Sequence, residues 1–345
     1  MTNEKLILAG DIGGTKTYLA LFTIREHVLE LAREASFSNA RYNGPEAIFR
    51  EFFSGNGVCM VEAAALGVAC PVVGNRCALT NLDWVVDGEG LKKAFGIKRL
   101  VLVNDLAAIG WGVGLLGDSD IHILQEGSPL PGNAALLAAG TGLGEAMLFW
   151  DGGAHTPSAS EGGHTDFAPR NAAEVELLNF LIAKYGHVSY ERIVSGPGLE
   201  NIYEFVKASG GRPEPEYLGK RFASEGVAPA VSDEAINGTD ENCRTAIDIF
   251  VTIYGAEAGN LALKTLSTAG VYVGGGIAPK ILKAMEAGEF LFAFRDKGRY
   301  RELMSKIPVK VILNDRAGLI GAANLAATLV DGQRARRIIM TGGLG

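Results

Sequence analysis

The chain has 345 residues, of which 48% are hydrophobic and 21% are charged, so it can bury a sizeable core and is long enough for two domains. Its formal net charge is −7 and no basic stripe is present, which argues against nucleic acid as its main partner. We find no secretory signal and no apolar run of the roughly 18 residues that a membrane span needs, so we expect a cytoplasmic protein that does not bind membranes.

Cysteine usage bears on compartment and on redox or metal chemistry. The four cysteines form no C-x-x-C pair, so the sequence indicates neither a zinc site nor a redox motif. We expect free thiols, as in a reducing cytoplasm, with Cys70 a small core residue. The four residues are Cys59, Cys70, Cys77 and Cys243.

Near the start of the chain, an apolar run, a glycine-rich turn and a second apolar run follow one another. Residues 6–9 and 17–22 predict two strands, and the turn between them has the sequence Gly10-Asp11-Ile12-Gly13-Gly14-Thr15. Glycine can adopt positive φ and lets a ligand approach the backbone, and the N–H groups of such a turn can bind an anion. An ordinary hairpin with a tight turn is the alternative interpretation.

Asp11 lies where the first predicted strand ends. A carboxylate beside a phosphate-binding turn is reasonable mainly if a metal ion lies between the two. Asp11 is therefore a candidate metal ligand, acting through a water molecule.

The same pattern returns 130 residues further on (140 − 10). Residues 134–139 form a small apolar run, Gly140-Thr141-Gly142-Leu143-Gly144 follows, and residues 146–150 are again apolar. Two phosphate-type hairpins in the two halves of one chain indicate a duplicated α/β architecture with a nucleotide held between the halves.

A continuous apolar strand at residues 100–103 ends on Asn104-Asp105. Ligands of open α/β sheets gather at the carboxyl ends of strands, so both side chains are candidate ligand-binding groups. A helix starts at about residue 106, and capping of that helix is the alternative role of Asn104 or Asp105.

The segment Glu161-Gly162-Gly163-His164 places two glycines between a carboxylate and an imidazole. A tight bend there would point both side chains the same way. Such a pair suits sugar hydroxyls, because each hydroxyl donates once and accepts twice. A metal half-site is the alternative, although no third ligand stands at metal spacing. Glu191 further on could be a solvated helix charge paired with Arg192.

A third glycine turn, Gly274-Gly275-Gly276, follows a predicted strand. Bare backbone at such a turn suits the packing of a flat ring system. A G-x-G-x-x-G match at Gly112, Gly114 and Gly117 follows a helical stretch instead of a strand and lacks the acidic residue about 20 positions on. We therefore reject dinucleotide binding at that match.

Hydrophobic periodicity and turn residues predict the remaining elements. In the first half of the chain they are a strand at 28–35, a helix after Gly44-Pro45, a strand at 64–72 and a loop or edge strand at 79–84, whose Thr80 and Asn81 could bind a polar ligand. In the second half they are a helix at 174–185, a polar surface excursion at 207–243, a long helix at 244–268 and a strand at 270–274. A helix with Pro279 in its first turn, a last strand at 309–313, a helix at 317–329 and a frayed tail from residue 334 complete the chain.

Six motifs in this order resemble the bacterial glucokinase family that lacks the repressor-type zinc motif, over about residues 5–330. They are Gly10-Asp11-Ile12-Gly13-Gly14-Thr15, Val103-Asn104-Asp105, Gly140-Thr141-Gly142-Leu143-Gly144, Glu161-Gly162-Gly163-His164-Thr165-Asp166-Phe167-Ala168-Pro169, Glu191-Arg192-Ile193-Val194-Ser195-Gly196-Pro197-Gly198-Leu199 and Gly274-Gly275-Gly276-Ile277. The resemblance implies an actin/hexokinase-like (ribonuclease H-like) duplicated α/β fold with two domains around a nucleotide and sugar cleft. It implies a homodimer that uses ATP and Mg²⁺ to convert D-glucose to D-glucose 6-phosphate, the entry step of glycolysis.

The resemblance also implies domain boundaries and a role for each motif residue. The smaller domain would comprise residues 1–113 and 315–345, and the larger one residues 114–314. The implied roles are catalytic base for Asp105, sugar binding for Asn104, Glu161, His164 and Glu191, phosphate binding for Gly10, Asp11, Ile12, Gly13, Gly14, Thr15, Gly140, Thr141 and Gly142, and adenosine binding for Gly274, Gly275 and Gly276.

Three other functions stay open at this point. A kinase for another sugar or amino sugar would share all of these motifs. A sugar- and nucleotide-binding regulator would usually carry a DNA-binding helix-turn-helix, which we do not expect because the chain opens on its first strand. A nucleotide-driven chaperone or filament protein should lack a base at the position of Asp105 and the Glu161/His164 pair.

Overall fold

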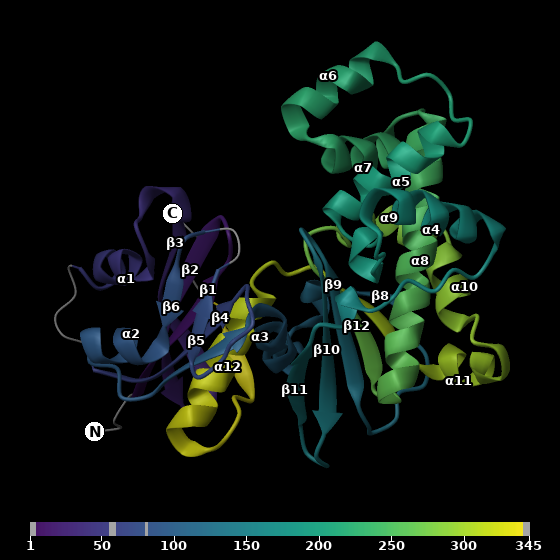
Figure 1. Ribbon diagram of the computed structural model, residues 1–345. Helices are drawn as coiled ribbons and strands as arrows, with labels where there is room; N and C mark the ends of the chain where they lie inside the picture. Colours follow the sequence, from purple (N-terminus) through teal and green to yellow (C-terminus); the bar gives the residue numbers. More distant parts are fainter. Residues whose placement is uncertain (1–4, 55–59, 80–81, 341–345) are drawn as a thin grey trace. The chain divides into compact units, whose positions relative to one another are not determined.

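The computed structural model describes residues 5–54, 60–79 and 82–340 of the chain. The chain forms two compact units (Figure 1). Unit 1 consists of residues 1–118 and 314–345, and unit 2 consists of residues 119–313. The chain therefore leaves unit 1 after residue 118 and returns to it at residue 314.

Unit 1 is built on a six-stranded sheet. Its strands, in spatial order, are β14 (Arg337–Ile339), β3 (Val28–Ser38), β2 (Lys16–Arg25), β1 (Lys5–Ile12), β4 (Val61–Val68) and β7 (Leu100–Asn104). β1, β2 and β3 are antiparallel neighbours, whereas β4 and β7 run parallel to β1. Ile12 therefore lies opposite Val68, and Val68 opposite Asn104, at one edge of the sheet.

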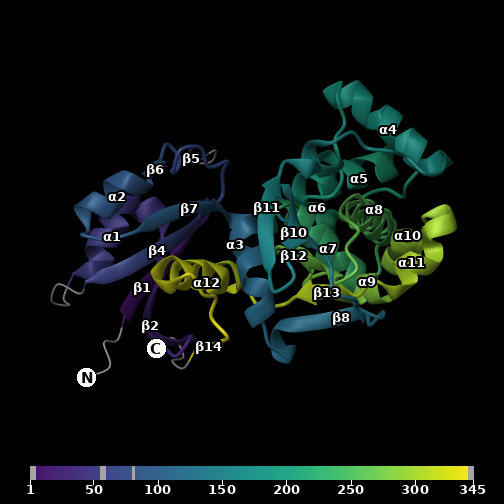
Figure 2. The same ribbon diagram turned by 90° about the horizontal axis from the view of Figure 1, so that it is seen from below.

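Helices cover both faces of this sheet. They are α1 (Pro45–Phe53), α2 (Gly88–Ala94), α3 (Asp105–Gly112) and α12 (Ala317–Asp331). α1 and α2 lie on one face and α12 on the other (Figure 2). Leu8 belongs to the core under α1, and its neighbour Ile7 to the core under α12. A strand buried on both faces has a continuous apolar sequence, which is why residues 6–9 show no alternation.

Unit 2 contains a second six-stranded sheet. Its strands, in spatial order, are β11 (His155–Ser160), β10 (Leu143–Trp150), β9 (Ala134–Ala139), β12 (Gly270–Gly274), β13 (Val309–Ile312) and β8 (Ile121–Gln125). β9, β12 and β13 run parallel, and the strands outside them are antiparallel to their neighbours. The hairpin of β9 and β10 repeats the hairpin of β1 and β2, so the predicted α/β class is confirmed.

The long helix α8 (Glu241–Thr265) lies in the core of unit 2. Its length and composition would allow it to cross a membrane, although Asp248 and Glu257 interrupt its apolar sequence. However, 72% of its most apolar window is buried inside the structure. Phe250, Tyr254 and Leu261 belong to the same core cluster as Leu137 of β9. Burial within the protein therefore accounts for the apolar composition of α8.

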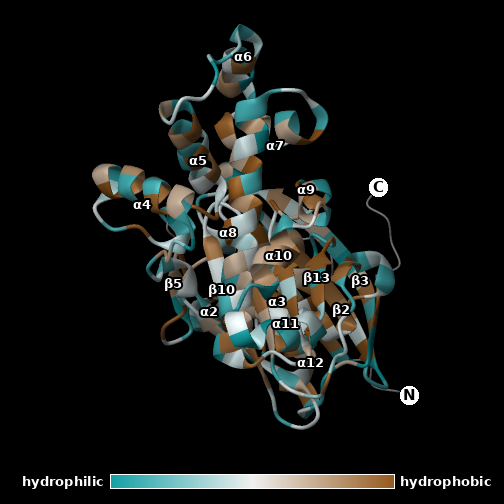
Figure 3. Ribbon diagram, turned by 90° about the vertical axis from the view of Figure 1, so that its right-hand side faces the viewer, coloured by the Kyte–Doolittle hydropathy of each residue, from teal (hydrophilic) through white to brown (hydrophobic). Residues whose placement is uncertain are grey.

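Segment 207–243, which the sequence predicts as a polar surface excursion, contains two helices that the sequence analysis does not anticipate. They are α6 (Glu216–Glu225) and α7 (Val227–Asn237). Leu218 and Val231 are fully buried, and polar and apolar bands alternate along α6 (Figure 3). The remaining α-helices of unit 2 are α4 (Ala172–Tyr185), α5 (Gly196–Ala208), α9 (Leu282–Glu286), α10 (Glu289–Arg295) and α11 (Arg301–Lys306).

The structure corrects two predictions near the C-terminal end of the sequence. Pro279 does not lie in the first turn of a helix, because residues 275–281 form turns and α9 begins after them. Residues 334–340 of the predicted frayed tail are ordered by β14, which pairs in parallel with β3, and residues 341–345 lie outside the described residues. The sequence of β14 is too short for periodicity to reveal a strand.

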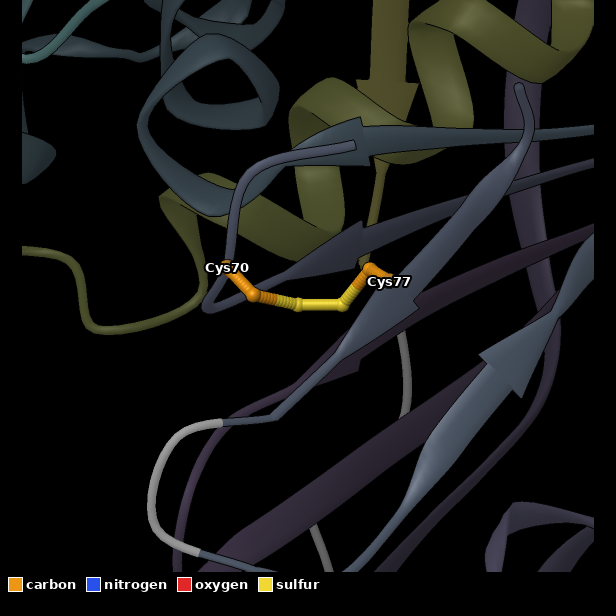
Figure 4. The surroundings of a disulfide bond; sticks show 2 residues. All are labelled: Cys70 and Cys77. Carbon is orange, nitrogen blue, oxygen red and sulfur yellow. A yellow bond between two sulfur atoms is a disulfide. The ribbon is translucent and has the colours of Figure 1, made fainter. Parts of the chain in front are cut away.

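Cys70 and Cys77 are joined by a disulfide bond (Figure 4). This finding corrects the expectation of free thiols for these two residues. Cys70 follows the end of β4, and Cys77 lies in β5 (Arg76–Ala78), which pairs with β6 (Val85–Asp87). Their Cα atoms are 6.1 Å apart, within the usual range for a disulfide. Both residues are buried, and Cys243 is a buried free thiol.

Loss of the Cys70–Cys77 bond is expected to lower the free energy of unfolding. The bond closes a short loop, with a sequence separation of 7. Loop-closure entropy for such a loop predicts a loss of about 2–3 kcal/mol. The measurement is urea unfolding with and without a reductant. The Cys70→Ser/Cys77→Ser double variant is the control, and an equal effect of reductant on its midpoint would contradict the prediction.

Candidate active site

In unit 1, the first glycine turn connects β1 to β2 and is held by a buried side chain. Asn39 Nδ2 donates to Gly13 O (2.8 Å), and Asn39 N donates to Thr15 O (2.9 Å). Thr17 Oγ1 donates to Asn39 Oδ1 (2.8 Å), and Asn39 is only 1% exposed. Two carbonyls of the turn are therefore bonded to the protein, as suits a turn that presents N–H groups to an anion. Sequence analysis missed Asn39, because nothing local links it to the turn.

Positive φ is not the reason for the glycines of this turn. Within the described part of the chain, the glycines with positive φ do not include Gly10, Gly13 or Gly14. Close packing explains Gly10 instead, since a Cβ there would lie 2.6 Å from Leu66 Cδ2 of β4. A larger residue would have to displace the buried side chains of Leu66 and Leu19 just before the turn.

The carboxyls of Asp11 and Asp105 interact within unit 1. Asp11 is near the end of β1, and Asp105 follows the end of β7 as the first residue of α3. Burial, and secondly the negative charge of Asp105, raise the pKa of the Asp11 carboxyl to about 7. Two carboxyls that repel each other form an arrangement that a divalent cation would stabilise.

These residues fit a Mg²⁺ ion that is bound mainly by its substrate. Among residues 5–54, 60–79 and 82–340, no group of three or more His, Cys, Asp or Glu side chains could hold a metal ion. Mg²⁺ usually binds one or two carboxylates together with substrate phosphates and keeps several waters. Asp11 beside the glycine turn meets that requirement only when phosphates are bound.

Asn104 and Asp105 are fixed by the start of α3. Asn104 is the N-cap, and its Oδ1 accepts from Leu106 N (3.0 Å) and Ala107 N (3.3 Å). Asp105 Oδ1 also accepts from Leu106 N (2.8 Å). Capping thus occupies the oxygen of Asn104, so a ligand would be bound through its amide Nδ2. The capping role and the ligand-binding role of Asn104 use different atoms and are compatible.

In unit 2, the second glycine turn connects β9 to β10 and is tied to Glu191. Glu191 Oε2 accepts from Leu143 N (2.9 Å), and a Cβ on Gly142 would overlap this carboxylate. Gly140 N donates to Gly142 O (2.8 Å), and Gly140 O accepts from Gly196 N at the start of α5 (2.8 Å). Gly142 therefore allows the close approach of Glu191 to the turn.

Glu161, His164 and Glu191 come together beside this turn. Residues 162–164 form a 3-10 helical bend, as the two glycines predict. His164 Nε2 lies 4.0 Å from Glu161 Oε2, and His164 Nδ1 lies 3.9 Å from Glu191 Oε1. The side chain of His164 is 59% exposed, that of Glu161 66% and that of Glu191 30%, so a ligand can reach all three. Two carboxylates around an imidazole supply the acceptors and the donor that a polyhydroxyl ligand needs.

The third glycine turn, residues 274–276, lies next to the second. β12 runs parallel to β9, with Gly274 opposite Ala138. Tyr254 of α8 connects the two turns, since its OH donates to Gly274 O (3.4 Å) and accepts from Ala139 N (3.2 Å). Gly275 has a φ of +85°, and a Cβ there would overlap Ala139 O, so this position requires glycine.

The predicted site residues thus form two sets, one in each unit. Unit 1 contains Gly10, Asp11, Ile12, Gly13, Gly14, Thr15, Asn104 and Asp105, and unit 2 contains Gly140, Thr141, Gly142, Glu161, His164, Glu191, Gly274, Gly275 and Gly276. Their roles stay predictions. Thr80 and Asn81, the other polar candidates, lie outside the described residues. Tyr254 was not among the predicted site residues, because its sequence context indicates only a core residue of α8.

Two α/β units with matching glycine hairpins define an actin/hexokinase-like fold, and solved structures confirm that class. The glucokinase of an Antarctic psychrotroph has a TM-score of 0.81 at 28% identity, over 94% of this chain and 99% of the other. The glucokinase of Balamuthia mandrillaris has a TM-score of 0.76 at 22% identity, over 94% of each chain, and supports the fold alone.

Sequence comparison identifies the family within that class. A family model described as Glucokinase matches residues 8–329. The glucokinase of Synechocystis sp. is 44% identical, over 93% of this chain and 97% of the relative. The chain belongs to the glucokinase family, and the predicted resemblance is confirmed.

Proposed function

We propose that this protein transfers the terminal phosphoryl group of ATP to D-glucose and forms D-glucose 6-phosphate. The observation that carries the proposal is the cluster of Glu161, His164 and Glu191 beside the phosphate-type turn at residues 140–142, within one unit. Relatives that carry the name glucokinase support the choice of substrate.

The carboxylates of this cluster would select the sugar. Glu161 and Glu191 can accept hydrogen bonds from hydroxyls, and His164 can donate or accept according to its tautomer. A sugar that lacks the matching hydroxyl leaves a carboxylate unpaired, which costs about 1–3 kcal/mol for each lost hydrogen bond. Selectivity among sugars would follow from these losses.

Asp105 would act as the general base. A sugar hydroxyl is a poor nucleophile, and its proton passes to the Asp105 carboxylate as its oxygen forms a bond to the γ-phosphorus. The bond from that phosphorus to the bridging oxygen breaks, and ADP leaves. General-base help of this kind is worth about 10²–10⁴-fold in rate. The hydrogen bond from Leu106 N to Asp105 Oδ1 orients the carboxyl for this role.

Backbone groups of the glycine turns would bind the nucleotide. Residues 10–15 and 140–142 would hold its phosphates, and residues 274–276 its adenosine. The hydrogen bonds of Tyr254 to Ala139 N and Gly274 O support a shared nucleotide site for the last two turns. Asp11 would hold Mg²⁺ together with the phosphates, and the ion would neutralise phosphate charge.

Three further properties belong to this proposal by family resemblance. The protein would act in the cytoplasm, at the entry step of glycolysis, and as a homodimer. Light scattering on the purified chain tests the last of these directly, since a monomer at assay concentration would contradict it.

The test of the proposed function is a coupled assay that scores sugar 6-phosphate with ATP, Mg²⁺ and a panel of sugars. Strong turnover of glucose and little turnover of fructose, mannose or N-acetylglucosamine is expected. Preference for another sugar would point to a different sugar kinase. Binding of ATP and glucose without turnover would favour a sugar- and nucleotide-binding regulator instead of an enzyme.

Replacement of Asn39 by Ala is expected to weaken ATP binding without changing glucose binding. The variant leaves the half-buried Gly13 carbonyl without its side-chain donor, which costs about 1–3 kcal/mol and loosens the turn. The KM for ATP should therefore rise several-fold, while the KM for glucose stays constant. Thr17→Val is the matched control, because it removes the Thr17–Asn39 hydrogen bond but keeps the one to Gly13. Equal effects of both variants would show a general loss of stability instead.

A further inference from the structure

Two buried glutamates in unit 2 have no role in the chemistry proposed above. Glu145 lies in β10 and is 2% exposed, and Glu257 lies in α8 and is 0% exposed. Within the described residues, Glu145 Oε1 has no hydrogen-bond partner. Burial, and secondly the charge of Glu257, raise the pKa of Glu145 to about 8. The two carboxyls therefore interact in the interior of the unit.

Glu145 supports the bend that carries Glu161 and His164. A Cβ on Gly162 would overlap Glu145 Oε2, so the Glu145 carboxyl fills the space beside Gly162. Ser160 Oγ donates to Glu145 O (3.1 Å) and accepts from Gly162 N (3.2 Å). The side chain of Glu145 thus contacts the bend, and its backbone is linked to the bend through Ser160.

Glu257 supports the segment that carries Glu191. Asn260 Nδ2 donates to Glu257 Oε2 (2.7 Å) and to Tyr190 OH (3.0 Å). Burial, and secondly the charge of Glu257, raise the pKa of Tyr190, which directly precedes Glu191. Tyr190 N donates to Thr165 O (3.1 Å), so the Glu191 segment is also bonded to the residue that follows the bend at residues 162–164.

The charges around the pair do not neutralise both carboxylates. Lys264 Nζ lies 3.4 Å from Glu257 Oε1, but its side chain is 48% exposed. On the same helix, Tyr254 also faces Glu145, and burial keeps the pKa of its phenol above the ordinary value. One ammonium that is half in water cannot balance two buried negative charges, so one carboxyl keeps its proton near neutral pH.

Lys297 is a further titratable group near the pair. Its Nζ donates to Asn260 Oδ1 (2.6 Å) and Ala256 O (2.9 Å). Burial, and secondly the charge of Arg170, lower the pKa of Lys297 to about 8. Lys297 therefore titrates in the same range as Glu145, and an experiment has to separate the two.

We propose that Glu145, protonated, and Glu257 beside it are positioning residues that hold the Glu161/His164 bend and the Glu191 segment in the geometry that binds the sugar. The inference rests on the proposed function, because it takes these segments as the glucose site. Neither carboxyl touches the substrate. The pair acts through Gly162 and Tyr190, the neighbours of the three sugar-binding side chains.

Loss of the Glu145 proton at alkaline pH places a second negative charge beside Glu257, beneath these segments. The bend and the Glu191 segment then separate, so the KM for glucose rises while kcat and the KM for ATP change little. The same loss of a proton also lowers the free energy of unfolding. The folded protein binds the extra proton between the ordinary pKa of 4.5 and the raised value of about 8, so its stability falls as pH rises through that range.

The experiment is the KM for glucose from about pH 7 to about pH 9.5 in the wild type and in Glu145→Gln, whose amide mimics the protonated carboxyl. The wild-type KM should rise at least about fivefold, and the Glu145→Gln KM should stay flat and near the neutral wild-type value. Glu145→Asp withdraws the carboxyl from Gly162 and should show a raised KM at every pH. A wild-type KM that does not change with pH would overturn the proposal.

Two control variants test which residue causes the alkaline rise in the KM for glucose. Glu174→Gln removes another buried carboxylate of the same unit, one that binds Arg170, and should keep the alkaline rise. Lys297→Met should keep it as well. If Lys297→Met abolishes the rise and Glu145→Gln retains it, the lysine is responsible and the proposal is overturned.

Amide hydrogen exchange at residues 161–167 and 190–193, corrected for intrinsic rates, gives a readout without catalysis. Protection there should fall across the same pH range in the wild type and not in Glu145→Gln. If the protein phosphorylates no sugar, the proposed function fails while the exchange result still decides whether the pair holds these segments. Unchanged protection would overturn the proposal whatever the activity.

Discussion

Asp105→Asn is expected to lower kcat by about 10²–10⁴-fold while the KM for glucose stays within about threefold of the wild type. Asparagine keeps an oxygen that can accept from Leu106 N, so the start of α3 is preserved and only the base is lost. Steady-state kinetics combined with glucose binding by calorimetry separates the two quantities.

A capping role alone would give a different result, and Asp87→Asn is the matched control. Asp87 is the N-cap of α2 in the same unit, and its Oδ1 accepts from Gly90 N (3.1 Å). If both variants keep most of their turnover and lose a similar amount of stability, Asp105 is a helix cap and the assignment of the base is wrong.

Glu191→Gln should raise the KM for glucose by about 10- to 100-fold, with a smaller change in kcat, because a hydrogen bond to a charged group is worth about 1.5–3 kcal/mol. The glutamine oxygen can still accept from Leu143 N, so the second glycine turn keeps its contact. The lost charge then affects mainly the side facing His164 and the sugar.

Glu216→Gln is the control for charge alone. Glu216 lies in α6 of the same unit, its side chain is 84% exposed, and it forms an ion pair with the exposed Lys220. Its replacement should leave the KM for glucose unchanged. A Glu191→Gln enzyme with a normal KM would remove Glu191 from the sugar site.

Sequence analysis could predict those elements and side chains whose signal is local. The glycine turns after residues 9, 139 and 273 stand out because close packing or positive φ excludes a side chain at Gly10, Gly142 and Gly275. The bend at residues 162–164 follows in the same way from its two glycines. Long apolar runs also predicted the central strands, since these are buried on both faces.

Features that depend on distant residues gave no local signal. Asn39 reaches the first turn from 26 positions away, and Tyr254 connects two turns from the middle of a helix. The Cys70–Cys77 bond depends on the position of β5 beside the end of β4. The polar sequence of α6 and α7 hid two helices, because only a few of their residues, such as Leu218 and Val231, enter the core.

The discontinuity of unit 1 has a consequence for biosynthesis. The ribosome completes β1 to β7 first, but α12 covers the face formed by Ile7, Ala9, Ala63 and Ala65. Unit 2 separates the two parts by 195 residues (313 − 118), which takes roughly 10–40 s at translation rates of about 5–20 residues per second. During that time unit 2 can fold as a continuous segment, whereas the nascent sheet of unit 1 exposes an apolar face. Unit 1 can therefore complete its core only after the whole of unit 2 has been synthesised, and until then the apolar face of its sheet is open to chaperones and to aggregation.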